Sequence, residues 1–361
     1  MPRIEHALEL NRHGTGHPGG MLIPVFALAA AVLAACCGRS VPETGVRVRV
    51  GHFPNVTHAQ ALYGRATGAF EKAVGRPVEW TQFNAGPSAV EALFAGAVDA
   101  SYVGPNPAIN GFIKSQGKSF VIVAGAASGG AALVVRSDAG ISSDRDFHGK
   151  TVATPQLANT QDVAARLWFA AHGYTGREKG GDLTILPLAN PDQLLMFGKK
   201  QIDAAWTVEP WVSRLEQEGH GRVFLDEKEL WPGGKYVTAV LVVRREFLAA
   251  HRDLVAKLVA AHVEATLAIN ADKGAAVPLL AAEIRRETSK ELPEAIVSSA
   301  LARIDLGWDP LPSALAKAAE DAHTIGFIRE RPDLTGIVES DVLNEVLAAK
   351  GLPPIAGGPI R

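Results

Sequence analysis

The fold class is indicated by the stretch from Val46 to His58, which reads VRVRVGHFPNVTH. Apolar and charged residues alternate over Val46–Val50, the pattern of a strand with one buried face. Gly51–Thr57 is rich in turn residues, and a helical pattern begins at His58. A strand, a loop and a helix in this order predict an α/β fold.

The same order of elements continues beyond this stretch. The pattern predicts a strand over Val78–Phe83, a loop over Asn84–Pro87, a helix over Ser88–Ala95 and a strand over Asp99–Val103, which Gly104–Pro107 ends. Such units place parallel strands side by side, with ligands bound at the carboxyl ends of the strands.

A second half of the chain repeats this order. A displacement of 104 residues carries Asn55 onto Asn159, Ala85 onto Ala189, Pro87 onto Pro191 and Asp99-Ala100 onto Asp203-Ala204. The identities are few, so the order of the elements carries the argument. We expect two similarly wound lobes with a ligand cleft between them. The apolar runs Ala131–Val135 and Val237–Val243 are the candidate crossing segments.

These patterns predict the domain organisation. A length of 361 residues suits two domains better than one, and 47% apolar residues allow both to bury a core. Lobe 1 is expected over residues 46–134, lobe 2 over 135–238, and residues 239–361 should return to lobe 1 and end in helices.

An export signal is predicted at the start of the chain. Met21–Ala35 is apolar throughout but shorter than a spanning helix, as in a signal peptide. Leu33-Ala34-Ala35-Cys36 resembles the bacterial lipoprotein box, in which the cysteine becomes the lipidated N-terminus. We therefore expect a signal peptide over residues 1–35, a tether over 36–45, and a periplasmic or outer-face location. Whether Met1 or Met21 is the start stays open.

Composition argues against several classes of partner. Lys plus Arg total 36 against 38 Asp plus Glu, with no long block of positive charge, so nucleic acid is not an expected partner. The two cysteines, Cys36 and Cys37, are adjacent and cannot join distant parts of the fold. No two histidines stand four residues apart beside a carboxylate, so no metal site is predicted.

Several segments, taken in order, are similar to a known family. They are Gly51–Asn55, Phe83–Ser88, Asp99–Pro107, Ala153–Leu157 and Glu209–Trp211. Together they resemble the nitrate, sulfonate and taurine type of ABC-importer binding proteins, from Val46 to about Leu267. The resemblance implies a two-lobed, periplasmic-binding-protein-like fold of type II with two crossover segments. It also implies that no cofactor is needed and that the ligand is delivered to a membrane permease driven by a separate ATPase. We further expect a monomer that is not an enzyme.

An anion can be held without a cationic side chain where helix N-termini converge on it. The candidate ligand-binding residues are therefore those near predicted helix starts and strand ends, with one nearby tryptophan: Asn55, Thr57, His58, Gly86, Ser88, Gly104, Asn106, Thr154, Asn159, Thr160, Gln161, Trp206 and Glu209.

Each candidate also has a purely structural interpretation. Ser88 is either a ligand donor or a helix cap, and Thr160 is the preferred donor of lobe 2. Asn106, between two prolines, is expected in an extended turn. Trp206 would cover the organic part of a ligand or pack in a core. Glu209 would begin a helix or pair with an ammonium group such as that of taurine.

The expected cargo is an aliphatic sulfonate or taurine. Nitrate, bicarbonate and a pyrimidine precursor remain alternatives, because no sequence feature separates them. The rival from another class is a small-molecule enzyme on the same bilobal fold, as in menaquinone and pyrimidine-precursor biosynthesis. The export signal favours the binding protein.

Overall fold

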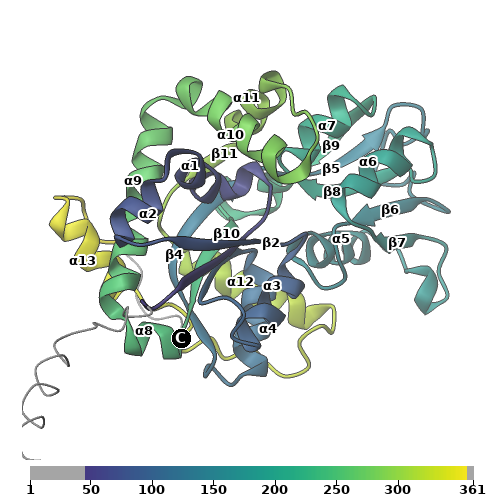
Figure 1. Ribbon diagram of the computed structural model, residues 1–361. Helices are drawn as coiled ribbons and strands as arrows, with labels where there is room; N and C mark the ends of the chain where they lie inside the picture. Colours follow the sequence, from purple (N-terminus) through teal and green to yellow (C-terminus); the bar gives the residue numbers. More distant parts are fainter. Residues whose placement is uncertain (1–44, 356–361) are drawn as a thin grey trace, which may run out of the picture. The chain divides into compact units, whose positions relative to one another are not determined.

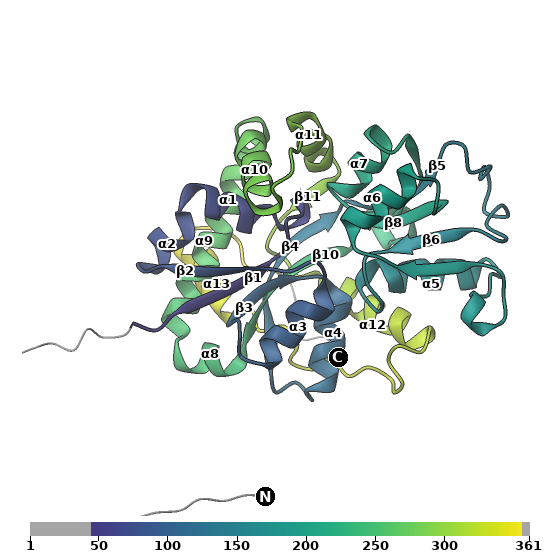
Figure 2. The same ribbon diagram turned by 45° about the vertical axis from the view of Figure 1, so that its right-hand side comes forward.

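Two β-sheets flanked by helices organise the structure, a computed structural model that describes residues 45–355 (Figures 1 and 2). The chain divides into two units, Met1–Val46 and Arg47–Arg361, and both sheets belong to the second. The predicted signal peptide, Cys36 and the tether up to residue 44 lie outside the described residues.

The first sheet, which defines lobe 1, has six strands: β1 (Val48–His52), β2 (Val78–Gln82), β3 (Ala100–Val103), β4 (Phe120–Gly129), β10 (Val237–Arg244) and β11 (Ile304–Leu306). Their order is β11-β4-β10-β3-β1-β2. β1 pairs in parallel with β2 and β3, whereas β10 is antiparallel to β3 and β4.

The second sheet, which defines lobe 2, has five strands: β5 (Ala131–Arg136), β6 (Thr151–Thr154), β7 (Thr184–Pro187), β8 (Ala204–Val208) and β9 (Gly221–Asp226). Their order is β7-β6-β8-β5-β9, with β6 parallel to β7 and β8. The order β7-β6-β8-β5 in lobe 2 matches the order β2-β1-β3-β10 in lobe 1.

Helices cover these sheets. They are α1 (Ala59–Thr67), α2 (Ala69–Val74), α3 (Gly86–Phe94), α4 (Pro105–Lys114), α5 (Thr160–Ala171), α6 (Asn190–Gly198), α7 (Trp211–Gln217), α8 (Arg245–Ala250), α9 (Arg252–Ala271), α10 (Lys273–Thr288), α11 (Glu294–Ala302), α12 (Pro312–Thr324) and α13 (Asp341–Ala349). Short 3-10 helices are η1 (Val56–His58), η2 (Arg177–Lys179), η3 (Glu227–Leu230) and η4 (Pro232–Gly234). In Figure 2, α1, α9 and α10 lie on the opposite side of the first sheet from α3 and α4.

Lobe 1 has a hydrophobic core on each face of its sheet. Leu241 and Val243 of β10 pack in one core with Leu258 of α9, while Val240 and Val242 pack in the other. Because side chains alternate along a strand, a strand buried on both faces reads as a continuous apolar run.

The predicted internal repeat is present in the structure. The 104-residue displacement carries α3 onto α6 from first residue to last, and Ala100 onto Ala204, where β3 and β8 begin. Asp99 accepts a hydrogen bond from the backbone N–H of Arg49 at 3.0 Å, and Asp203 accepts one from that of Thr151 at 2.9 Å. Equivalent carboxylates thus join equivalent strands in the two lobes.

The crossings differ from the predicted ones. The chain leaves the first sheet after β4, crosses at Gly130, and returns between β9 and β10. The predicted boundaries at 134/135 and 238/239 therefore fall inside β5 and β10. Both runs are apolar because their strands are buried, while the first crossing uses Gly129 and Gly130, whose φ angles of 80° and 76° favour glycine.

Candidate functional site

A small pocket lies between the two lobes, at the carboxyl ends of their parallel strands. It encloses about 30 Å³ and is lined by Phe53, Asn55, Asn84, Ala85, Gly86, Gly104, Pro107 and Thr238 from lobe 1 and by Pro155, Asn159, Thr160, Gln161, Asn190 and Val208 from lobe 2. Among these lining residues, none carries a charge. The pocket is therefore polar without being ionic.

Four helix N-termini meet at this pocket. Its lining includes the first residue of α3 (Gly86), of α5 (Thr160) and of α6 (Asn190), and the N-cap of α4 (Gly104). The first backbone N–H groups of a helix have no partner inside the helix and carry partial positive charge. Four such ends around one space favour an anion.

Proline helps to start three of these helices. Pro87 in α3, Pro105 in α4 and Pro191 in α6 each stand at one of the first two helical positions. Proline suits this place because its fixed φ is helical and its missing N–H is not needed there. The first-turn N–H groups that have no partner inside their helix remain available to a ligand.

The start of α5 is held by a chain of polar contacts. The Asn159 side chain caps the helix by accepting a hydrogen bond from the backbone N–H of Asp162 at 2.9 Å. The Asp162 carboxylate accepts a hydrogen bond from Thr154 at 2.9 Å and pairs with Arg166 at 3.0 Å. The negative charge in this first turn is thus neutralised by Arg166, outside the pocket lining.

Thr160 is the lining residue with the clearest unmet hydrogen bond. The residue is only 7% exposed, and its hydroxyl has no hydrogen-bond partner within the described part of the chain. A buried hydroxyl without a partner is costly, so it indicates a place for a ligand atom. The prediction of Thr160 as a lobe 2 donor therefore has structural support.

The structure brings part of the predicted set together. The predicted residues that line the pocket are Asn55, Gly86, Gly104, Asn159, Thr160 and Gln161. Asn55 contacts the opposite lobe as well, because its side-chain oxygen accepts a hydrogen bond from the indole N–H of Trp211 at 3.0 Å.

Ser88 is not among the lining residues. α3 begins at Gly86, so Ala85 holds the N-cap position that the sequence assigned to Ser88. Ser88 is the third residue of α3, two residues after Gly86, and is exposed. The helix begins earlier than predicted because Gly86-Pro87 already adopts helical geometry.

Three other predicted polar residues are buried in the fold and do not line the pocket. Asn106 lies within the first turn of α4, not in an extended turn, and donates a hydrogen bond to the Ala318 carbonyl of α12 at 3.1 Å. Thr57 and Thr154 are buried and do not line the pocket.

His58 does not line the pocket but contacts Phe53, which does. Its Nδ1 accepts a hydrogen bond from the backbone N–H of Phe53 at 3.1 Å, and the two rings stack with centroids 4.4 Å apart. Burial, with a smaller effect of nearby His52, holds the pKa of His58 well below its usual value. A neutral imidazole therefore positions Phe53, and its role is structural.

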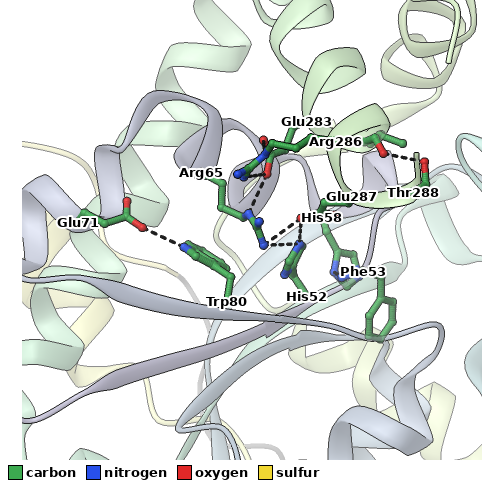
Figure 3. Close-up of polar contacts among 11 residues, drawn as sticks. His52, Phe53, His58, Arg65, Glu71, Trp80, Glu283, Arg286, Glu287 and Thr288 are labelled. Atoms are coloured by element: carbon green, nitrogen blue, oxygen red, sulfur yellow. Dashed lines mark hydrogen bonds and ion pairs between the residues drawn. The ribbon is translucent and has the colours of Figure 1, made fainter. Parts of the chain in front are cut away.

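A buried ionic cluster fixes the same loop to α10, as Figure 3 shows. His52 contacts Glu287 at 2.5 Å, and Arg65 contacts Glu287 at 2.9 Å and Glu283 at 2.8 Å. Because Phe53 follows His52 directly, the cluster fixes the backbone that carries this ring into the pocket lining.

Trp206 and Glu209 do not line the pocket. Trp206 is fully buried in the lobe 2 core and donates a hydrogen bond to Glu227 at 2.7 Å. Glu209 is also buried; it accepts hydrogen bonds from Ser213 and pairs with Arg303 at 3.0 Å. Burial raises the pKa of Glu209. Its charge is already matched by Arg303, so an ammonium group is not needed as partner.

Eight further lining residues were not predicted: Phe53, Asn84, Ala85, Pro107, Pro155, Asn190, Val208 and Thr238. A signal existed for Asn190, because it stands 104 residues after Gly86 in the internal repeat. Phe53 and Asn84 follow the carboxyl ends of β1 and β2, where lining residues are expected. Thr238 comes from β10, whose place beside the pocket depends on the return crossing.

The family follows from sequence comparison. A model of the NMT1-like family matches residues 42–283, more than half of the chain. The chain belongs to the NMT1-like family. This NMT1-like protein is 28% identical over 224 residues to the taurine-binding periplasmic protein of Escherichia coli K12, covering 62% of this chain and 67% of that one. It is 28% identical over 192 residues to a putative aliphatic sulfonates-binding protein of Bacillus subtilis 168, covering 52% and 54%.

Solved structures confirm the fold of this NMT1-like protein. The alkanesulfonate-binding protein SsuA from Xanthomonas axonopodis pv. citri, bound to MOPS, matches with a TM-score of 0.67 at 21% identity, covering 82% of this chain and 99% of that one. The nitrate-binding protein NrtA from Synechocystis PCC 6803 matches with a TM-score of 0.71 at 14% identity, covering 85% and 89%. The predicted two-lobed binding-protein fold is thus confirmed.

Proposed function

We propose that this chain is the extracytoplasmic solute-binding component of an ABC importer and that it captures a small organic anion. The ligand we propose is an aliphatic sulfonate. The observation that carries the proposal is the meeting of four helix N-termini around a pocket between two lobes. Such a site attracts an anion through backbone N–H groups and can release it when the lobes separate.

The chemistry of the lining favours a sulfonate over nitrate. A sulfonate has three acceptor oxygens for the helix starts and for the Thr160 hydroxyl, and an organic end that can contact the Phe53 ring. Nitrate and bicarbonate have no organic end to use that ring. The relatives named for taurine and for aliphatic sulfonates support this choice.

A binding role also suits the lining better than catalysis. The side chains around the pocket are amides, hydroxyls and apolar groups, which hold a ligand but do not exchange protons near neutral pH. The enzyme alternative on the same fold would need a nucleophile or an acid-base residue next to the ligand.

The proposal extends to the partners and the location. Export through the segment Met21–Ala35 and lipidation of Cys36 would hold the protein at the outer face of the cytoplasmic membrane, as a monomer, beside its permease and ATPase. This part rests on the sequence and on relatives named as periplasmic binding proteins.

Calorimetric titration with methanesulfonate, ethanesulfonate, taurine, nitrate and bicarbonate tests the cargo. We expect the sulfonates to bind and Thr160→Val to weaken them by about 0.5 to 3 kcal/mol, the range for one hydrogen bond. Ser88→Ala is the matched control and should change little, because Ser88 is exposed and outside the lining. Tight nitrate binding with no sulfonate binding would overturn the cargo assignment.

A further inference from the structure

We propose that the pocket favours anions that carry no proton, because four of its five amide side chains have their oxygens engaged and so offer N–H groups to a ligand. This inference rests on the proposed anion-binding function and narrows its ligand class. Carboxamides have a donor end and an acceptor end, so the partner of each oxygen decides which end remains for a ligand.

The Asn55 amide is oriented by the opposite lobe. Its oxygen accepts the hydrogen bond from the Trp211 indole N–H at 3.0 Å. An indole nitrogen can only donate, so this partner fixes the oxygen of Asn55 and not its nitrogen. The NH₂ group of Asn55 is therefore the end that is left for the pocket.

A relay at the start of α5 has the same result. The backbone N–H of Asp162, which can only donate, donates a hydrogen bond to the side-chain oxygen of Asn159. The NH₂ group of Asn159 then donates to the oxygen of Gln161 at 3.2 Å. The NH₂ group of Gln161 and the second hydrogen of Asn159 remain for a ligand.

Asn190 receives a hydrogen bond from its own sheet. The hydroxyl of Thr207, fully buried in β8, donates to the oxygen of Asn190 at 3.0 Å. The helix starts add backbone N–H groups, and their carbonyls point away along the helices. Among the described lining side chains, the oxygens of Asn84, Thr160 and Thr238 have no donor partner and can accept; Thr238 donates its own hydrogen to the Gly129 carbonyl and keeps its lone pairs.

This donor-rich lining treats two classes of anion differently. A sulfonate at neutral pH has only acceptor oxygens, so each can receive a hydrogen bond. A singly protonated phosphonate has the same shape but carries an O–H that needs an acceptor. A buried donor without an acceptor is unfavourable, and the lining offers more donors than acceptors, so the protonated form should bind more weakly than the dianion.

Methanesulfonate and methylphosphonate form the test pair, because they differ in protonation and hardly in shape. Calorimetric titrations are run from below to above the second pKa of methylphosphonic acid. Methanesulfonate affinity should stay flat, which controls for titration of the protein. Methylphosphonate affinity should rise about tenfold per pH unit until that pKa and then level off, as when only the dianion binds.

Two variants test the hydrogen bonds that orient these amides. Thr207→Val releases the Asn190 oxygen, so the amide can turn and accept, and the preference for the methylphosphonate dianion should shrink. Asn159→Asp keeps an oxygen for the cap of α5 but replaces the NH₂ group by a carboxylate oxygen. It should abolish methanesulfonate binding while the melting temperature is retained.

The outcomes separate the two proposals. Equal binding of both protonation states of methylphosphonate, beside normal methanesulfonate binding, overturns the selectivity and leaves the anion-binding function standing. Failure of methanesulfonate and of the methylphosphonate dianion to bind the wild-type protein overturns both. An unchanged dianion preference in Thr207→Val, with the protein folded, overturns the role of Asn190.

Discussion

A β-carbon placed on Gly104 would lie 2.6 Å from the hydroxyl oxygen of Thr160 in the opposite lobe. The two residues line the pocket from facing sides, Gly104 at the N-cap of α4 and Thr160 at the first position of α5. The absence of a side chain at residue 104 is therefore what allows these two helix ends to approach each other.

Gly104→Ala should weaken ligand binding by keeping the lobes apart or by turning the Thr160 hydroxyl away. Overpacking of this kind costs about 1 to 3 kcal/mol, which corresponds to an affinity loss of about five- to 150-fold. Titration with ethanesulfonate measures this loss, and X-ray scattering should show less compaction on ligand addition than in wild type. Gly198→Ala is the control, because its β-carbon meets nothing within 4 Å. Equal affinity of Gly104→Ala and wild type would contradict this role.

Arg303, which is not a lining residue, should stabilise the contact between the lobes. It pairs with buried Glu209 at 3.0 Å and with Glu216 of α7 at 2.7 Å. Arg303→Met leaves Glu209 without its charge partner and should lower the free energy of unfolding by about 1 to 3 kcal/mol. Urea denaturation measures it.

A second substitution separates this charge effect from lost packing. Adding Glu209→Gln to Arg303→Met should restore part of the stability, because no buried charge is then left. Arg252→Met, which breaks an exposed pair with Glu345, should change the stability little, because solvent screens that pair. If the Glu209 substitution restores nothing, the interpretation as a buried pair is wrong.

Glu227 should make stability depend on pH. Burial beside Trp206 raises its pKa from 4.5 to about 7. The stabilisation that Glu227 gives the folded state is fully present below pH 4.5, where its carboxyl is protonated in both the folded and the unfolded protein. It is lost as the pH rises to about 7. Above that range Glu227→Gln should be more stable than wild type by on the order of 3 kcal/mol. Thermal denaturation across this range should show a flatter profile for Glu227→Gln; parallel profiles would contradict it.

Phe53, and not Trp206, should respond to the length of the ligand chain. Phe53→Ala should weaken longer alkanesulfonates more than methanesulfonate, by about 0.8 kcal/mol for each methylene that covers the ring. Trp206→Phe should lower stability, because it removes the hydrogen bond to Glu227, but should leave the chain-length dependence unchanged. A chain-length effect in Trp206→Phe alone would reverse this assignment. Titration of both variants against one homologous series measures the difference.

Cys36 should anchor the protein to the membrane. Cys36→Ala removes the thiol that would be lipidated, so the protein should move from the membrane fraction to the soluble extracytoplasmic fraction. Cys37→Ala is the neighbouring control and should stay membrane-bound. Equal membrane association of wild type and Cys36→Ala would refute the anchor.

The sequence was sufficient for the order of elements and for the region of the site. Alternation in Val46–Val50 predicted β1, and the repeat placed α6 and β8 at the positions where α3 and β3 recur. Parallel strands of one sheet end at the same edge, so residues following β1 and β3 had to lie near one another, and residues following β6 had to lie at the matching edge of the second sheet. That is why Asn55, Gly104 and Thr160 were found from sequence.

Tertiary structure alone decided which side chains face the ligand. Gly86 lines the pocket and Ser88 does not, because two residues along a helix point in different directions and packing sets the rotation. Trp206 and Ala205 point to opposite faces of β8, and the helices that cover each face determine what they contact. Asn55 meets Trp211 across 156 residues of chain. Local periodicity fixes an element, but the direction of its side chains depends on contacts between residues far apart in sequence.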